Sequence, residues 1–172
     1  MLVNRGSVLR LATSQVRDNP GIGISTEANS TLAVNGSTIS HNGGNGIDLG
    51  RGSQGTIGTS TISDNGADAN KPGNGVSAWG ASGAHIGGDN VITGNREHGV
   101  IMAGGSTAHI FNNTITGNAG SGINLAFDST LMLWPPTTDA TGNGGLGLYC
   151  NDEESSAFDV ANLLGGTNCS GF

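Results

Sequence analysis

Residues 113–125 read Asn-Thr-Ile-Thr-Gly-Asn-Ala-Gly-Ser-Gly-Ile-Asn-Leu, two short alternating stretches joined by a glycine-rich turn. The second stretch has the form Gly-Ile-x-Leu, and copies of it recur along the chain. These copies occupy residues 21–24, 46–49, 75–78, 99–102, 122–125 and 145–148. Their first apolar residues lie at positions 22, 47, 76, 100, 123 and 146, so most steps are close to 23 residues. A repeat of this length predicts a solenoid in which each unit stacks on the next.

Three further sets of positions keep nearly the same period. Short strands of the type Thr-Ile-Ser or Thr-Ile-Thr are expected at residues 38–40, 61–63, 91–93 and 114–116, with Val91 in place of one threonine. An asparagine follows at Asn19, Asn42, Asn65, Asn95, Asn118 and Asn143. A third, less uniform strand is expected at residues 31–34, 56–58, 85–87, 108–110 and 131–133. Agreement between independent sets of positions strongly favours a repeat architecture.

Three short strands per coil, each alternating inward and outward, place one or two apolar side chains per strand inside a tube. One coil cannot bury its apolar side alone, so coils stack about 4.8 Å apart as parallel strands. We therefore predict an all-β, right-handed parallel β-helix of about six coils, with the hand set by the crossover rule. The coils are expected near residues 8–29, 30–52, 53–81, 82–105, 106–128 and 129–150, so that residues 1–150 form the solenoid and 151–172 a C-terminal cap.

This architecture makes specific pairings testable. One internal column is expected to contain Ile39, Ile62, Ile92 and Ile115, and a second Ile22, Ile47, Val76, Val100, Ile123 and Leu146. The ladder asparagines are expected to exchange side-chain amide hydrogen bonds between coils. Cys150 and Cys169 are expected to form a disulfide that clamps the cap, with two unrelated buried thiols as the alternative.

The composition restricts the classes of partner. Thirteen acidic and six basic residues give a net charge of -7, which disfavours binding to a phosphate backbone, so nucleic acid is not an expected partner. No apolar stretch approaches the roughly 20 residues of a membrane-spanning helix. Residues 1–11 are too short and too polar for a signal peptide, whereas residues 8–11 already have the pattern of a strand. We therefore expect a fragment of a longer secreted or cell-surface protein, either monomeric or stacked edge to edge.

The two sets of strands resemble the right-handed parallel β-helix superfamily of pectate lyases and their relatives. The runs at 113–118 and 90–95 are similar to the generic repeat of many secreted or surface bacterial proteins. The resemblance covers roughly residues 8–150 and implies a fold rather than an activity. The Asn-Thr-Asp, Asp-Asp, Gly-His-Gly and Asp-Pro-His runs of its carbohydrate-active members do not occur in this chain; the nearest approach is Glu97-His98-Gly99.

Several outward residues are candidate ligand-binding groups. Asp48, Asp64 and Asp68 would bind Ca²⁺ if they met near the long third repeat, where residues 66–74 form an insertion, although a solvated surface is the simpler interpretation. Trp79 would stack on sugar rings if it lies on the same exposed face as Phe127, although packing against the solenoid is the plainer explanation. Asn124 projects from the same strand set as Asp48.

His85 and His109 occupy equivalent positions and are expected to stack on adjacent coils, pointing outward. Two imidazoles about 5 Å apart can share a metal, but no third ligand is evident between the neighbouring Thr56 and Met132. An exposed histidine stack without metal is the alternative. No cofactor is otherwise expected.

Our leading functional hypothesis is a non-catalytic β-helix segment that acts as a rigid spacer or contacts a polysaccharide or cell-surface glycan. The competing hypothesis is a carbohydrate-active lyase, hydrolase or epimerase, or a truncated relative of one. The two differ in whether carboxylates and a base converge in a groove along the solenoid.

Overall fold

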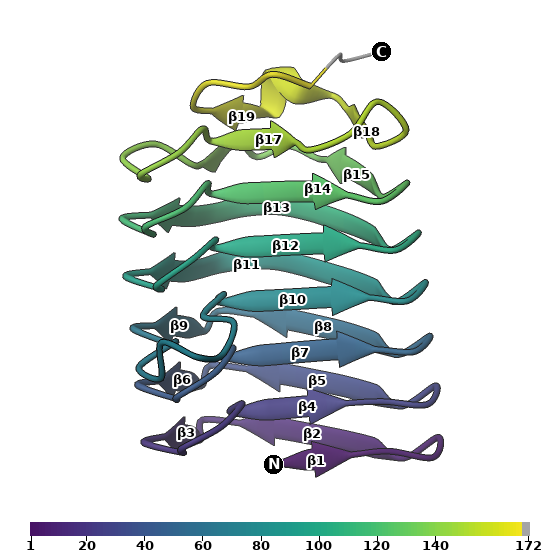
Figure 1. Ribbon diagram of the computed structural model, residues 1–172, viewed down its shortest axis with the longest axis vertical. Helices are drawn as coiled ribbons and strands as arrows, with labels where there is room; N and C mark the ends of the chain where they lie inside the picture. The colour runs from purple at the N-terminus through teal and green to yellow at the C-terminus, as the bar shows by residue number, and fades with distance from the viewer. Residues whose placement is uncertain (170–172) are drawn as a thin grey trace.

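Parallel β-strands stack coil upon coil throughout residues 1–169, the part of the chain that the computed structural model describes (Figure 1). The front wall in Figure 1 has seven strands in chain order: β1 (Leu2–Val3), β4 (Ile24–Thr26), β7 (Ile47–Gly50), β10 (Val76–Trp79), β12 (Val100–Ala103), β14 (Ile123–Ala126) and β17 (Leu148–Cys150). The solenoid therefore has about seven coils rather than the expected six, because β1 pairs with β4 ahead of the first coil expected from the repeat.

Two further walls complete each coil. The second contains β2 (Val8–Ala12), β5 (Thr31–Asn35), β8 (Gln54–Gly58), β11 (Gly83–Thr93), β13 (Thr107–Thr116), β15 (Thr130–Leu133) and β18 (Ser156–Phe158). The third contains β3 (Gln15–Arg17), β6 (Thr38–Ser40), β9 (Thr61–Ser63), β16 (Thr138–Asp139) and β19 (Leu163–Leu164). In the middle coils β11 and β13 run through the corner and supply strands to both of these walls, so three separate strands per coil are not maintained throughout.

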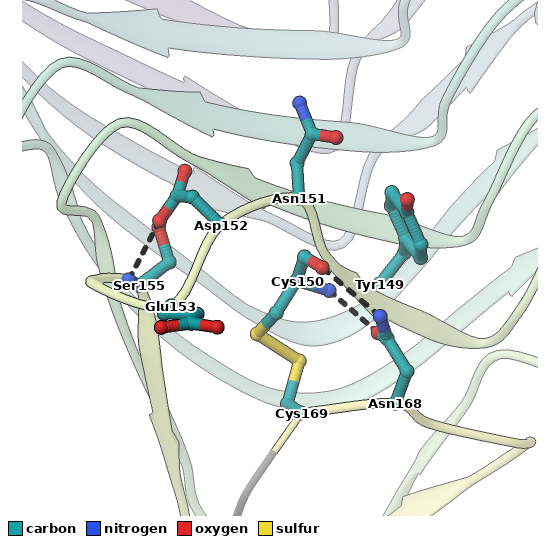
Figure 2. Close-up of a pocket in the computed structure, with 8 residues that line it drawn as sticks. All are labelled: Tyr149, Cys150, Asn151, Asp152, Glu153, Ser155, Asn168 and Cys169. Atoms are coloured by element: carbon teal, nitrogen blue, oxygen red, sulfur yellow. Dashed lines mark hydrogen bonds between the residues drawn. A yellow bond between two sulfur atoms is a disulfide. The ribbon is translucent and has the colours of Figure 1, made fainter.

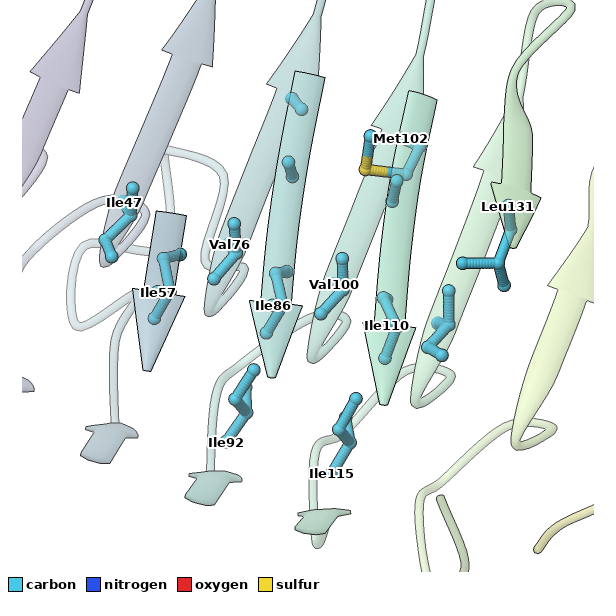
Figure 3. Packing of buried hydrophobic residues seen from close by; sticks show 14 of the residues in the cluster. Ile47, Ile57, Val76, Ile86, Ile92, Val100, Met102, Ile110, Ile115 and Leu131 are labelled. Atoms are coloured by element: carbon cyan, nitrogen blue, oxygen red, sulfur yellow. The ribbon is translucent and has the colours of Figure 1, made fainter. Parts of the chain in front are cut away.

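The core is a set of aliphatic columns enclosed by the three walls (Figure 3). Ile39, Ile62, Ile92 and Ile115 pair in succession and are fully buried, which confirms the first predicted column. Stacking of identical β-branched side chains fills the tube closely, and burial of these columns is the main apolar contribution to the stability of the fold.

The second predicted column is wrong at both ends. Ile47 pairs with Ile24 rather than Ile22, and Ile123 pairs with Leu148 rather than Leu146. Both end repeats contain two apolar residues separated by one glycine, so a shift of two residues preserves the inward face and cannot be detected from alternation alone. Leu146 is consequently exposed to solvent.

The predicted asparagine ladder is continuous from Asn19 to Asn143. From Asn42 onward each Oδ1 accepts a hydrogen bond from the Nδ2 of the preceding ladder asparagine, at 2.7–3.0 Å. The same Oδ1 also accepts from that residue's backbone N–H, so the ladder satisfies polar groups at a corner where strand pairing is interrupted.

A second ladder, absent from our prediction, lies at the next corner. The backbone N–H groups of Ser14 and Ser37 donate to the Oγ of the serine one coil on, and that of Ser60 donates to Asn90 Oδ1. Asn90 in turn donates to Asn113. The signal in the sequence is a serine or asparagine directly before residues 15–17, 38–40, 61–63, 91–93 and 114–116. It was missed because serine and asparagine both occur at this position, although each supplies an equivalent accepting oxygen.

The insertion at residues 66–74 folds back over the coils that precede it. In Figure 1 it projects beside β6 and β9. Its backbone N–H groups at Ala67 and Asp68 donate to Asn42 O and Gly43 O, and Lys71 Nζ donates to Pro20 O at 2.6 Å. The inserted loop is therefore anchored to the solenoid rather than free in solvent.

The chain continues the walls beyond residue 150. β18 pairs with β15 and β19 pairs with β16, while a 3-10 turn at Val160–Asn162 lies between them. Cys150 and Cys169 form the predicted disulfide. These residues cover the last full coil, so its main-chain groups are not left as an open edge. The boundary that we placed at residue 150 between solenoid and cap stays a prediction.

Candidate functional site

The outer face of the front wall carries one row of residues from successive coils. Its members are Ser25, Asp48, Ser77, Ile101, Asn124 and Tyr149. Parallel pairing places neighbours in this row about 4.8 Å apart. The row therefore holds mostly polar residues at a fixed spacing, of which Ser77 and Asn124 are buried, and it contains two of the predicted site residues.

Asp48 has the most unusual environment in this row. Its carboxylate is largely buried and accepts hydrogen bonds from Ser77, Trp79 and Asn45. Burial raises the pKa of the Asp48 carboxyl, the three hydrogen bonds oppose that rise, and the negative charge of Glu27 adds to it. Asp48 is thus a carboxyl group that takes up a proton more readily than an exposed aspartate.

We expect the Asp48 carboxyl to titrate with a midpoint above its ordinary value of 3.8 when followed by carbon-detected NMR. Because the folded-state pKa is raised, the folded state binds this proton more tightly than the unfolded chain. Asp48 therefore lowers stability as the pH rises from the ordinary value through the raised one. Asp48→Asn should abolish that slope, and a midpoint at or below 3.8 would contradict the burial argument.

The other two candidate carboxylates lie elsewhere. Asp64 follows β9 at a corner, where its Oδ2 is 4.0 Å from His41 Nε2. Asp68 lies in the insertion and pairs with Lys71 Nζ at 2.9 Å, and the hydrogen bond from Lys71 lowers the pKa of the Asp68 carboxyl. Within residues 1–169 no group of three or more His, Cys, Asp or Glu side chains is placed to hold a metal ion. The expected Ca²⁺ site therefore lacks the shared cluster of carboxylates on which it was based.

Trp79 packs against the solenoid. Its indole lies over Gly50, where an added Cβ would come within 2.7 Å of ring atoms, and the Arg51 guanidinium lies 5.7 Å from the ring centroid. Phe127 is at the same end of the front wall, two coils further on, and is 69% exposed. The ring of Phe127 is thus exposed to solvent, whereas the Trp79 indole is packed against the Gly50 backbone and the Arg51 guanidinium.

Asn124 is paired with a histidine that our sequence reasoning did not connect to it. The Nδ2 of Asn124 lies 2.9 Å from His98 Nε2, and His98 Nδ1 accepts a hydrogen bond from Ser121 N–H. Burial lowers the pKa of the His98 imidazole, which favours its neutral form. Asn124 itself is buried, so this pair is a structural element of the wall as well as a candidate contact.

A second cluster lies on the outer face of the second wall. His85 and His109 are stacked on adjacent coils with ring centroids 6.1 Å apart, and Phe111 and Trp134 surround them. The Trp134 ring is 4.6 Å from His109 and is 39% exposed. In residues 1–169 neither imidazole forms a hydrogen bond or an ion pair. The predicted histidine stack is therefore present, with unused nitrogen atoms.

Met132 extends the same outward column. The register pairs His85 with His109 and His109 with Met132. Leu131 and Leu133 on either side are fully buried, so alternation directs the Met132 side chain outward beside His109. Two imidazoles and one thioether thus follow one another on three successive coils.

A polar depression lies at the C-terminal end, next to the disulfide (Figure 2). Asn168 Nδ2 donates to Cys150 O at 3.0 Å, and Asn168 Oδ1 accepts from Cys150 N–H at 2.8 Å. Asp152 accepts from the backbone N–H groups of Ser155 and Phe127, and a hydrogen bond from Ser155 lowers the pKa of its carboxyl. Most polar groups here tie residues 150–155 to Asn168 and to one another, which is a structural role.

Comparison with known proteins gives two family matches. Residues 1–91 match the family described as "Right handed beta helix region", and residues 58–157 match the family described as "Periplasmic copper-binding protein (NosD)". Each match covers more than half of the 172 residues. No curated protein and no solved structure matches the chain significantly.

The name of the second family implies copper, so the side chains in this chain that could serve as copper ligands are relevant. Both cysteines are in the disulfide and offer no thiolate. Imidazole and thioether groups are copper ligands, and the column of His85, His109 and Met132 lies wholly inside the matched segment. These three side chains fit the metal by donor type, and they are the residues that would hold it.

Parallel strands, in-register isoleucine columns and the asparagine ladder agree with both comparisons. No helix among the described residues has the length and apolar character to cross a bilayer. The chain is thus a member of the right-handed β-helix family and, over residues 58–157, of the NosD family.

Proposed function

We propose that this chain is a non-catalytic, rigid β-helical module of a periplasmic or cell-surface protein. The observation that carries the proposal is the unbroken register of the asparagine ladder across six coils. A solenoid whose successive coils are hydrogen-bonded to one another along a whole corner is stiff and holds outward groups at a fixed spacing. A spacer or presenting surface needs these properties, and an enzyme needs in addition a group of reactive side chains.

Incubation of the chain with a panel of acidic and neutral polysaccharides tests the non-catalytic part. We expect neither unsaturated uronate products nor new reducing ends. Product formed by the wild-type chain and lost in Asp48→Asn would favour the enzyme hypothesis, since Asp48 with Glu27 is the carboxyl pair whose charges interact on the front wall. Small-angle scattering should give the dimensions of a single stiff solenoid at all concentrations if the module is a monomeric spacer.

We further propose that the outer face of the front wall binds a glycan. Asp48 and Tyr149 supply partly exposed polar groups in one row, and exposed Phe127 supplies an aromatic ring near its end. The net charge of -7 favours a neutral glycan over a uronate polymer. On a glycan array, Phe127→Ala should reduce any binding that the wild-type chain shows, whereas Phe111→Ala on the second wall should not.

A second candidate function is copper binding, which the NosD match and the donor column at His85, His109 and Met132 favour together. It does not conflict with the first, because these residues lie on the second wall. Titration of the chain with Cu(I) against a chromophoric chelator is the direct test. One equivalent bound per chain supports it, and no binding contradicts it.

A further inference from the structure

We propose that His85, His109 and Met132 form a single Cu(I) site on the outer face of the second wall. The proposal rests on the copper-binding function above and goes further by assigning all three side chains to one ion and by naming its oxidation state. The site is defined by the register of β11, β13 and β15 rather than by a run of neighbouring residues. The cysteines take no part in it.

The separation of the histidines is suitable for one shared metal ion. Metal–imidazole bonds are about 2.0–2.1 Å long, so two rings bound to one ion have centroids roughly 5–6 Å apart, depending on the angle at the metal. The observed centroid distance is 6.1 Å, with the ring planes inclined by 64°. Parallel strand pairing fixes this spacing, because both side chains project from paired positions of β11 and β13.

The third donor selects the metal. Met132 is paired in register with His109, and its thioether is a soft ligand that favours Cu(I) over Zn²⁺. A thioether carries no charge, so two neutral imidazoles and one methionine suit a monovalent ion in a half-buried setting better than a divalent one.

The surroundings of His85 and His109 resemble a ligand-binding site more than a packed core. Phe111 lies against His85 at 5.2 Å, and Trp134 lies against His109 at 4.6 Å. Phe111 also covers Gly87, where an added Cβ would come within 2.2 Å of the ring. These rings limit the motion and hydration of both imidazoles, while the side chains stay accessible from solvent. A preorganised, partly dehydrated site of this kind strengthens metal–ligand interactions.

The experiment is an anaerobic competition titration of Cu(I) against a chromophoric chelator, with the disulfide verified intact by a thiol assay. We expect one Cu(I) per chain. His85→Gln and His109→Gln should each weaken binding by about 10- to 100-fold or more, the range that follows from disturbing a metal site. His41→Gln removes an exposed histidine outside the column and should leave the affinity unchanged.

Met132→Leu separates the copper site from a generic histidine site. This variant should lose Cu(I) affinity and the sulfur scatterer in X-ray absorption, while any Zn²⁺ affinity stays as in the wild type. In a Trp79→Phe background, Cu(I) should also change the emission of Trp134, which contacts His109. Circular dichroism of each variant checks that the solenoid is intact.

The outcomes separate the two proposals. Stoichiometric Cu(I) binding that is unaffected in all three ligand variants would overturn this site and leave copper binding by the chain in place. Absence of Cu(I) binding to the wild-type chain would overturn both. Binding that depends on the histidines but not on Met132, with Zn²⁺ preferred, would overturn the Cu(I) assignment.

Discussion

Replacing Asn65 by alanine should lower the free energy of unfolding by about 3–5 kcal/mol, because several buried polar groups lose their partners together. Asn65 Oδ1 accepts from both Asn42 N–H and Asn42 Nδ2, and Asn65 Nδ2 donates to Ile39 O and Asn95 Oδ1. All of these atoms lie at a buried corner, where an unsatisfied group costs about 1–3 kcal/mol. Urea denaturation followed by circular dichroism measures the change.

Asn19→Ala is the matched control for this prediction. Asn19 is the first member of the ladder, half-buried, and its loss leaves Asn42 Oδ1 still bonded to the backbone N–H of residue 19. We expect a loss of about 1 kcal/mol or less. Equal effects at the two positions would show that the ladder does not stabilise the solenoid through burial.

Hydrogen exchange adds a spatial readout to the same variant. Because each coil interacts only with its neighbours, the damage at Asn65 should appear first in its own coil and in the adjacent coils. Amides of β6 and β9 should lose protection before those of β13 and β14. A uniform loss along the chain would instead mean that the solenoid unfolds as one unit.

The second large effect is expected for Gly99→Ala. A Cβ on Gly99 would lie 2.4 Å from Ile115 Cγ2, 2.7 Å from Gly122 O and 3.0 Å from Asn118 Nδ2. It would therefore collide with the isoleucine column, the next coil's backbone and the asparagine ladder at once. Overpacking of a tight interior costs about 1–3 kcal/mol and occasionally more, and we expect the upper end because one contact is with backbone.

Gly21→Ala provides the control on the same type of residue. A Cβ added at Gly21 would meet no atom within 4 Å, and the backbone there has no positive φ. Its replacement should be neutral or stabilise the protein by up to about 1 kcal/mol, since alanine has fewer unfolded conformations. Thermal denaturation of both variants makes the comparison, and a tolerated Gly99→Ala would contradict the packing geometry.

This geometry explains why glycine opens the repeat. Gly46, Gly75 and Gly99 each face a ladder asparagine, an isoleucine Cγ2 and the carbonyl of the equivalent glycine one coil on. The sequence shows only that glycine recurs at these positions. The reason is the close approach of coils at the corner, which leaves no room for a side chain.

The candidate sites were less predictable than the fold. Alternation correctly placed Asp48, Asn124, His85 and His109 on outer faces. It did not indicate that Asp48 accepts hydrogen bonds from Trp79 and Ser77, that Asn124 pairs with His98, or that the three candidate carboxylates lie in different settings. These contacts depend on side-chain directions and on the corner geometry, which the period does not encode.

The sequence by itself determined the coil, the inward residue types and the asparagine ladder of this protein. Equivalent positions contact one another at a constant period, so the pattern along the chain is also the pattern of contacts in space. Only the tertiary structure decided the register of the two end repeats and the grouping of Phe111 and Trp134 around the histidines. The physical reason is that alternation is unchanged by a shift of two residues, and that outward side chains are free of the packing constraint that makes the interior periodic.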